Sequence, residues 1–109
     1  MSKTKYSLRY LPLFYDDLAQ KVNYIAETLH NPAAACKLLD NLEKAILERL
    51  PVAEAFEQYN SARERTYPYY RIYVGNFVVY YVVIAADEQN KIMEVRRLLY
   101  RGQNRTEII

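Results

Sequence analysis

The sequence predicts an α+β fold, in which an N-terminal strand and an antiparallel helix hairpin precede a three-stranded antiparallel meander (β-α-α-β-β-β). Two observations predict it. Residues 12–50 carry two helical stripes of apolar side chains, interrupted only at residues 30–32. Residues 69–100 carry runs rich in valine, isoleucine and tyrosine, separated by tight turns. Because helices precede most of the strands, α+β is favoured over a βαβ repeat.

Chain length and composition further limit the possible fold and location of the protein. A chain of 109 residues suits a single domain, 1–109, and can bury a core without disulfides or metal. Cys36 is the only cysteine, so no internal disulfide can form, and it is expected to be a small buried residue. The N-terminus lacks the apolar segment of a secretory signal, and no apolar run approaches the roughly 20 residues of a membrane helix. These features favour a cytoplasmic protein without a membrane partner.

The first strand is expected over Lys5–Tyr10, where tyrosine and leucine alternate with polar residues. Pro12 is suited to the first position of the helix that follows. Asp16 and Asp17 are interpreted as carboxylates that stabilise the positive N-terminal end of this helix. Its apolar stripe predicts the face turned to the core: Phe14, Leu18, Val22, Ile25 and Leu29.

The second helix is expected to begin at Asn31 and Pro32, since asparagine caps helices well and proline fits their first turn. Pro51 ends it. His30 is interpreted as a turn residue rather than a general base. Two amphipathic helices joined by so short a turn should pack as an antiparallel hairpin on one face of the sheet, leaving the other face for function. The second stripe is Ala35, Leu39, Leu42, Ile46 and Leu50.

The segment 52–68 is interpreted as a loop, with a helical turn over residues 53–59 and an extended piece near Arg65. Turns at residues 75–76 and 87–90 then separate three predicted strands. The tail from Arg101 to Ile109 is polar apart from its last two residues, which are expected to pack against the body. The predicted strands of the meander are Tyr69–Val74, Phe77–Ala85 and Lys91–Tyr100.

Positive charge is concentrated near the C-terminus. The net charge is only +2, but residues 96–105 contain four arginines and no acid. Arginine suits planar contacts with phosphate, although a solvated, solubilising face is the simpler interpretation. The sequence contains twelve tyrosines. Tyrosines usually fill a core with their hydroxyl groups at its rim, and the alternative role is stacking on nucleobases.

Several short motifs, in their order along the chain, carry a family resemblance. Asn31–Ala35 reads Asn-Pro-Ala-Ala-Ala at the start of a helix. Tyr70–Val82 forms the central hairpin pattern, and Arg97–Tyr100 closes the last strand before the tail. In this order and spacing the chain resembles the RelE/ParE superfamily of toxins from type II toxin–antitoxin systems. The Asn-Pro-Ala-Ala helix start and the long hairpin look more like the ParE branch.

The resemblance implies a toxin that inhibits growth, serves plasmid stabilisation and is silenced by a cognate antitoxin. ParE-like toxins poison DNA gyrase, whereas RelE-like toxins cut mRNA in the ribosomal A site. No cofactor, metal or small-molecule substrate is implied. A decayed toxin that retains only antitoxin binding is a further alternative, because Gln103 and Asn104 stand where the family more often has arginine and aspartate.

Whether the protein is an enzyme stays open at this point; if it is, a metal-independent mRNA endoribonuclease is expected. Cleavage by the RNA 2′-hydroxyl needs a base, an acid and cations around the phosphate. Three arginines are candidates for the cations, and a tyrosine near an arginine is a candidate acid or base. Arg96 and Arg97 are adjacent, so they are expected on opposite faces of their strand. The candidate site residues, for catalysis or target binding, are Arg71, Tyr73, Arg97, Tyr100 and Arg101.

Overall fold

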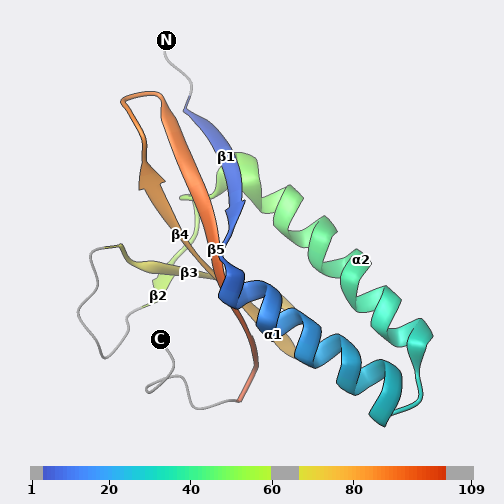
Figure 1. Ribbon diagram of the computed structural model, residues 1–109. Helices are drawn as coiled ribbons and strands as arrows, with labels where there is room; N and C mark the ends of the chain where they lie inside the picture. The colour runs from blue at the N-terminus through green and yellow to red at the C-terminus, as the bar shows by residue number, and fades with distance from the viewer. Residues whose placement is uncertain (1–3, 60–66, 103–109) are drawn as a thin grey trace.

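The computed structural model of the chain describes residues 4–59 and 67–102, and within them the predicted α+β order is confirmed. The two helices lie on one side of a twisted sheet (Figure 1). Along the chain the elements are β1 (Lys5–Tyr10), α1 (Pro12–Asn23), the π-helical turn η1 (Tyr24–Thr28), α2 (Pro32–Arg49), the 3-10 turn η2 (Leu50–Val52), β2 (Gln58–Tyr59), β3 (Tyr69–Val74), β4 (Phe77–Ala85) and β5 (Asn90–Tyr100).

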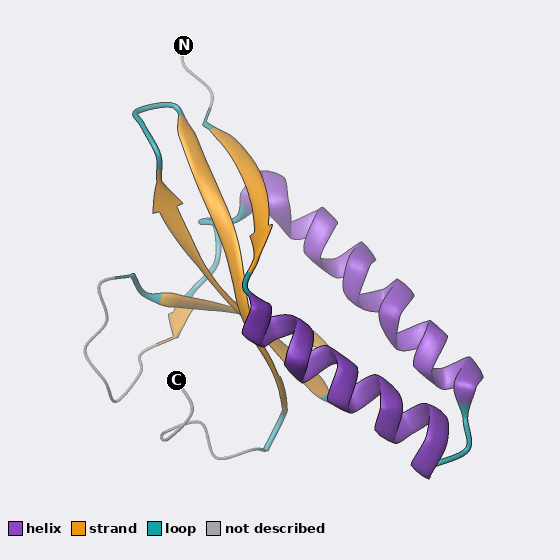
Figure 2. Ribbon diagram, viewed as in Figure 1, coloured by secondary structure: helices purple, strands orange, loops and turns teal. Residues whose placement is uncertain are grey.

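The strands form one sheet in the order β1-β5-β4-β3-β2. Strands β3, β4 and β5 make the predicted antiparallel meander, while β1 joins the opposite edge by pairing parallel to β5 (Figure 2). The helical turn expected over residues 53–59 is wrong. The turn occurs earlier, at Leu50–Val52, and Gln58 with Tyr59 instead pairs antiparallel with β3. The extended piece expected near Arg65 lies outside the described residues.

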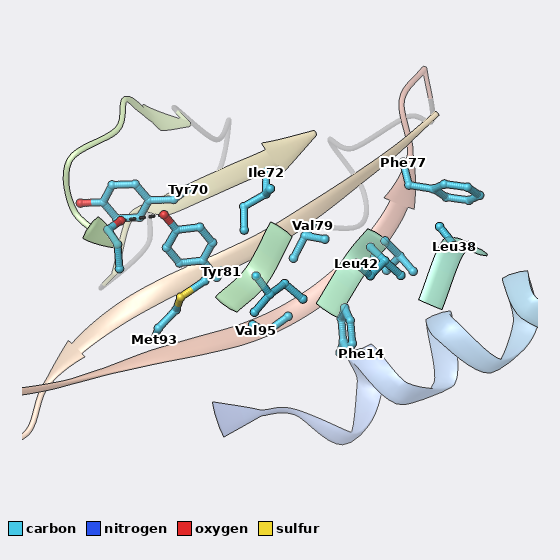
Figure 3. Packing of buried hydrophobic residues seen from close by; sticks show 13 residues of the cluster. Phe14, Leu38, Leu42, Tyr70, Ile72, Phe77, Val79, Tyr81, Met93 and Val95 are labelled. Carbon is cyan, nitrogen blue, oxygen red and sulfur yellow. Dashed lines mark hydrogen bonds between the residues drawn. The ribbon is translucent and has the colours of Figure 1, made fainter. Parts of the chain in front are cut away.

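The core lies between the helix hairpin and one face of the sheet (Figure 3). The Tyr81 hydroxyl is satisfied inside it, because it donates to the Ala53 carbonyl at 2.6 Å and accepts from the Arg49 guanidinium at 3.0 Å. The fully or nearly buried residues of this core include Phe14, Leu38, Leu42, Ile46, Ile72, Val79, Tyr81, Met93, Val95 and Leu98.

The expected helix faces need three corrections. On α2, Leu38 is 7% exposed and Leu39 is 39% exposed, so the buried stripe runs through Leu38. Cys36 is exposed because it lies about 100° around the helix from buried Ala35. Leu29 is exposed because it follows η1, where its N–H bonds to the Tyr24 carbonyl five residues back. A π turn holds an extra residue and therefore rotates later side chains off the stripe.

The end of β5 has an unusual neighbour. Strand β1 stops at Tyr10, opposite Val95, and Leu11 then donates its N–H to the Val95 carbonyl at 2.9 Å. From there α1 runs beside β5, so residues 96–100 have a helix rather than a strand along that edge. This arrangement brings side chains of α1 within reach of the end of β5.

Candidate functional site

The face of the sheet turned away from the helices carries three of the five candidate residues. Tyr70 and Ile72 belong to the helix-side core, whereas Tyr69 packs with β4 residues on the opposite side. Because side chains alternate along a strand, Arg71 and Tyr73 lie on the same side as Tyr69. We call this side the far face.

Arg71, Tyr73 and Arg101 form one cluster on the far face. The guanidinium of Arg101 lies 4.9 Å from the centroid of the Tyr73 ring, and that of Arg71 lies 5.7 Å from it. Tyr73 is 50% exposed. The Arg101 backbone N–H donates to the Asn76 carbonyl at 2.9 Å, which ties the start of the tail to the β3–β4 turn. An exposed aromatic ring with two guanidinium groups close to it suits an anionic or planar group on a partner.

Tyr100 is directed to the other side of the sheet. Its ring centroid lies 4.9 Å from that of Phe77, a helix-side core residue, and the Lys21 ammonium lies 5.1 Å from it. Tyr100 therefore lies away from Arg71 and Tyr73, although Tyr100 and its sequence neighbour Arg101 both line one pocket. Alternation along the strand accounts for the separation.

Arg97 is held by α1 through a bidentate ion pair. Its Nε donates to Asp17 Oδ2 at 2.7 Å and its Nη2 donates to Asp17 Oδ1 at 2.9 Å. The Leu98 backbone N–H also donates to Asp17 Oδ2, at 3.0 Å, where β1 no longer provides an acceptor. The hydrogen bonds to Asp17 raise the pKa of Arg97 above its ordinary value. Asp17 is thus a buried partner of β5, and its interpretation as helix-start electrostatics is wrong.

The two adjacent arginines of β5 do not follow strict alternation. Tyr80 pairs with Arg97 and Tyr81 pairs with Val95, so the ladder is irregular at Arg96. Val95 and Leu98 both lie in the helix-side core although they are three residues apart, which leaves both arginines outside that core. The expectation that they take opposite faces of a regular strand is therefore wrong; a bulge, which adds one residue to a strand, explains it.

Glu94 is a buried carboxylate that joins two strands. Arg9 on β1 donates from Nε to Glu94 Oε2 at 2.9 Å, and Arg96 donates from Nε to Oε1 at 2.8 Å. Burial alone would raise the pKa of Glu94, but the hydrogen bonds from the two arginines outweigh it and hold the pKa below its ordinary value. The folded state therefore binds this proton less well than the unfolded chain.

Acid should consequently weaken the fold through Glu94. A carboxyl group with a depressed folded-state pKa contributes stability above its unfolded pKa of about 4.5, and that contribution is lost as the pH falls further. We expect Glu94→Gln to lower the free energy of unfolding at pH 7 by about 1–2 kcal/mol, since two arginines lose their carboxylate. Urea titrations from pH 3 to 8 should show the difference shrinking below pH 4.5. Glu88→Gln, at an exposed turn position, is the matched control; a constant difference at every pH would contradict the assignment.

A comparison with models of protein families identifies the family of this chain. The model of the ParE toxin of type II toxin–antitoxin systems (parDE) matches residues 8–105, nearly the whole chain. The chain belongs to the ParE toxin family. A search of curated protein sequences found no match. Membership in this family implies a cognate antitoxin as partner.

Two surfaces of this ParE-family chain are hollow. A groove of about 500 Å³ runs between α1 and α2, and it is bordered by the exposed side chains of Tyr15, Leu39 and Leu47. At the opposite end of α1, two pockets share Tyr24 and Tyr100 as walls. Within residues 4–59 and 67–102, no helix is both long and apolar enough to cross a membrane, and no three His, Cys, Asp or Glu side chains are grouped to hold a metal ion.

The sequence did not lead us to expect Asp17 and Lys21 as buried residues of α1: Asp17 was interpreted only as a helix-start carboxylate, and Lys21 was not singled out. A signal for them exists. Phe14, Asp17 and Lys21 are spaced by three and four residues, the spacing of one helix face. Two charged residues in step with a core phenylalanine indicate buried partners, and Arg97 and Tyr100 are those partners.

Proposed function

We propose that this ParE-family toxin inhibits bacterial growth in the cytoplasm by binding DNA gyrase through the Arg71–Tyr73–Arg101 cluster, without cleaving a bond. The observation that carries the proposal is the exposed Tyr73 ring with two guanidinium groups close to it on the far face. Such a surface binds by charge and stacking, and aromatic and arginine side chains dominate the affinity of many interfaces.

The spread of the candidate residues supports binding over RNA cleavage. Cleavage requires an acid, a base and cations around one phosphate. Tyr100 lies across the sheet from Arg71 and Tyr73, and the Arg97 guanidinium is engaged by Asp17. The five residues therefore do not converge on one reacting group, and the RelE-like nuclease is the less favoured function.

We further propose that the groove between α1 and α2 receives an apolar helix of the cognate antitoxin. Tyr15, Leu39 and Leu47 expose large apolar surfaces along this groove, which is unusual for residues without a partner. An amphipathic helix laid into such a groove would cover them. The groove lies on the helix side, so antitoxin binding in this groove would not depend on the far-face cluster.

Expression with and without the antitoxin tests the proposed function. Induction of the toxin alone should arrest growth and induce DNA-damage signalling, and co-expression of the antitoxin from the adjoining gene should restore growth. Purified toxin should inhibit gyrase supercoiling. Unchanged supercoiling with A-site cuts on translating ribosomes would instead establish the nuclease, and unhindered growth at high expression would indicate a decayed toxin.

A further inference from the structure

The Lys21 side chain is largely buried, but its ammonium makes no ion pair. The residue is 4% exposed. Among the described residues its ammonium has no hydrogen bond and no ion pair, and it lies 5.1 Å from the centroid of the Tyr100 ring. A lysine ammonium has three N–H donors, and that of Lys21 is not sealed inside the core, so these donors are open to a ligand that enters beside it.

The charges around Lys21 do not balance. Asp17 is the nearby carboxylate, but its two oxygens already accept hydrogen bonds from Arg97 and from the Leu98 backbone. Burial and the charge of Arg97 lower the pKa of Lys21, and Asp17 only partly opposes them. One carboxylate thus faces two cations, and the surplus positive charge would be neutralised by one further anion.

A pocket of about 550 Å³ lies beside this surplus charge. Lys21, Gln20, Tyr24 and Tyr100 line it. Lys21 is thus a polar side chain that is more than nine-tenths buried and contributes to the pocket wall. The chain at this place forms the π-helical turn η1, a conformation that is frequent at functional sites.

A second pocket, of about 590 Å³, shares Tyr24 and Tyr100 with the first. Its other walls are largely apolar and include Ile25, Leu29 and Phe77, and it also touches Arg101. A cationic pocket and an apolar pocket that share two tyrosines as walls would accept neighbouring side chains of one peptide, one acidic and one apolar. We call the pair the Lys21 double pocket.

We propose that the Lys21 double pocket binds a segment of the cognate antitoxin, in which an acidic side chain pairs with Lys21 and a nearby apolar side chain fills the second pocket. The inference rests on the proposed function for the identity of the partner. The antitoxin is favoured over the target because an occupant of the second pocket contacts Arg101, a member of the far-face cluster. Occupancy by the antitoxin would therefore disturb the surface proposed to hold the target, which is what a neutralising partner requires.

The test compares full-length variants for their affinity to the purified cognate antitoxin. Lys21→Met keeps the aliphatic stem and removes the charge, and Lys37→Met, at an exposed position of α2, is the matched control. We expect Lys21→Met to weaken binding at least tenfold and to reduce its salt dependence, whereas Lys37→Met stays within twofold of the wild type. Gyrase inhibition by Lys21→Met should be unchanged.

One outcome would establish the inference and three would overturn it. A double-mutant cycle in which one antitoxin carboxylate, changed to its amide, loses its effect in the Lys21→Met background would establish the pair. An affinity within twofold of the wild type would overturn it, as would weaker gyrase inhibition with intact antitoxin binding. A lower Tm with unchanged affinity would also overturn it, since Lys21 would then serve the fold. If the wild type itself fails to bind the antitoxin, the proposed function fails instead.

Discussion

Replacing Asp17 by alanine is expected to lower the free energy of unfolding by about 3–5 kcal/mol, as is typical when one partner of a buried ion pair is removed. The variant would leave the Arg97 guanidinium, whose side chain is 19% exposed, without its bidentate acceptor. It would also leave the Leu98 backbone N–H unpaired in a buried position. The loss is large because one carboxylate satisfies three donors.

Urea denaturation followed by circular dichroism measures this change. Asp16→Ala is the control, since Asp16 is the exposed neighbour on the same helix and should change stability by less than about 0.5 kcal/mol. Equal effects of the two variants would show that both aspartates act only through the helix end. Arg97→Ala removes the same ion pair and is expected to lose toxicity because it unfolds. Loss of toxicity in this variant should therefore be assigned to target binding only if its stability is measured as well.

The element boundaries could be predicted because they depend on local chemistry. Pro12, Pro32 and Gly75 each fix the backbone where they stand, and Gly75 adopts the positive φ of +58° that a tight turn demands. The burial of Leu38 rather than Leu39 could not be predicted from the sequence. Both fit a helical stripe, and only packing against the sheet decides between them.

The site depends on contacts that spacing in the sequence does not encode. Asp17 and Arg97 are 80 residues apart, and their pairing requires β1 to stop short of the end of β5. Arg71 and Tyr73 could be assigned to one face by alternation. Arg101 comes close to Tyr73 only because Val78 pairs with Tyr73 on one side and with Leu99 on the other. That register follows from the whole sheet.

Within the proposed function, Arg101→Ala is expected to have the largest effect on toxicity and little effect on stability. Its side chain is exposed and lies on the Tyr73 ring, so its removal creates no cavity. Loss of an interface hot spot costs at least about 2 kcal/mol, which corresponds to roughly 30-fold weaker binding. Titration of gyrase supercoiling inhibition against toxin concentration measures this. Lys44→Ala, at an exposed position of α2, is the control and should inhibit like the wild type.

Arg71→Ala and Tyr73→Ala should likewise reduce gyrase inhibition with little effect on stability. Combining the two arginine substitutions tests whether they act through the same ring. Both guanidinium groups contact one ring, so the Arg71→Ala and Arg101→Ala effects should not add, because either loss releases Tyr73 from its stacked position. Tyr73→Phe should retain most inhibition if the ring face binds the target, whereas a proton-transfer role for the hydroxyl predicts loss comparable to alanine. Additive arginine effects together with an inactive Tyr73→Phe would contradict a stacking surface and restore the case for RNA cleavage.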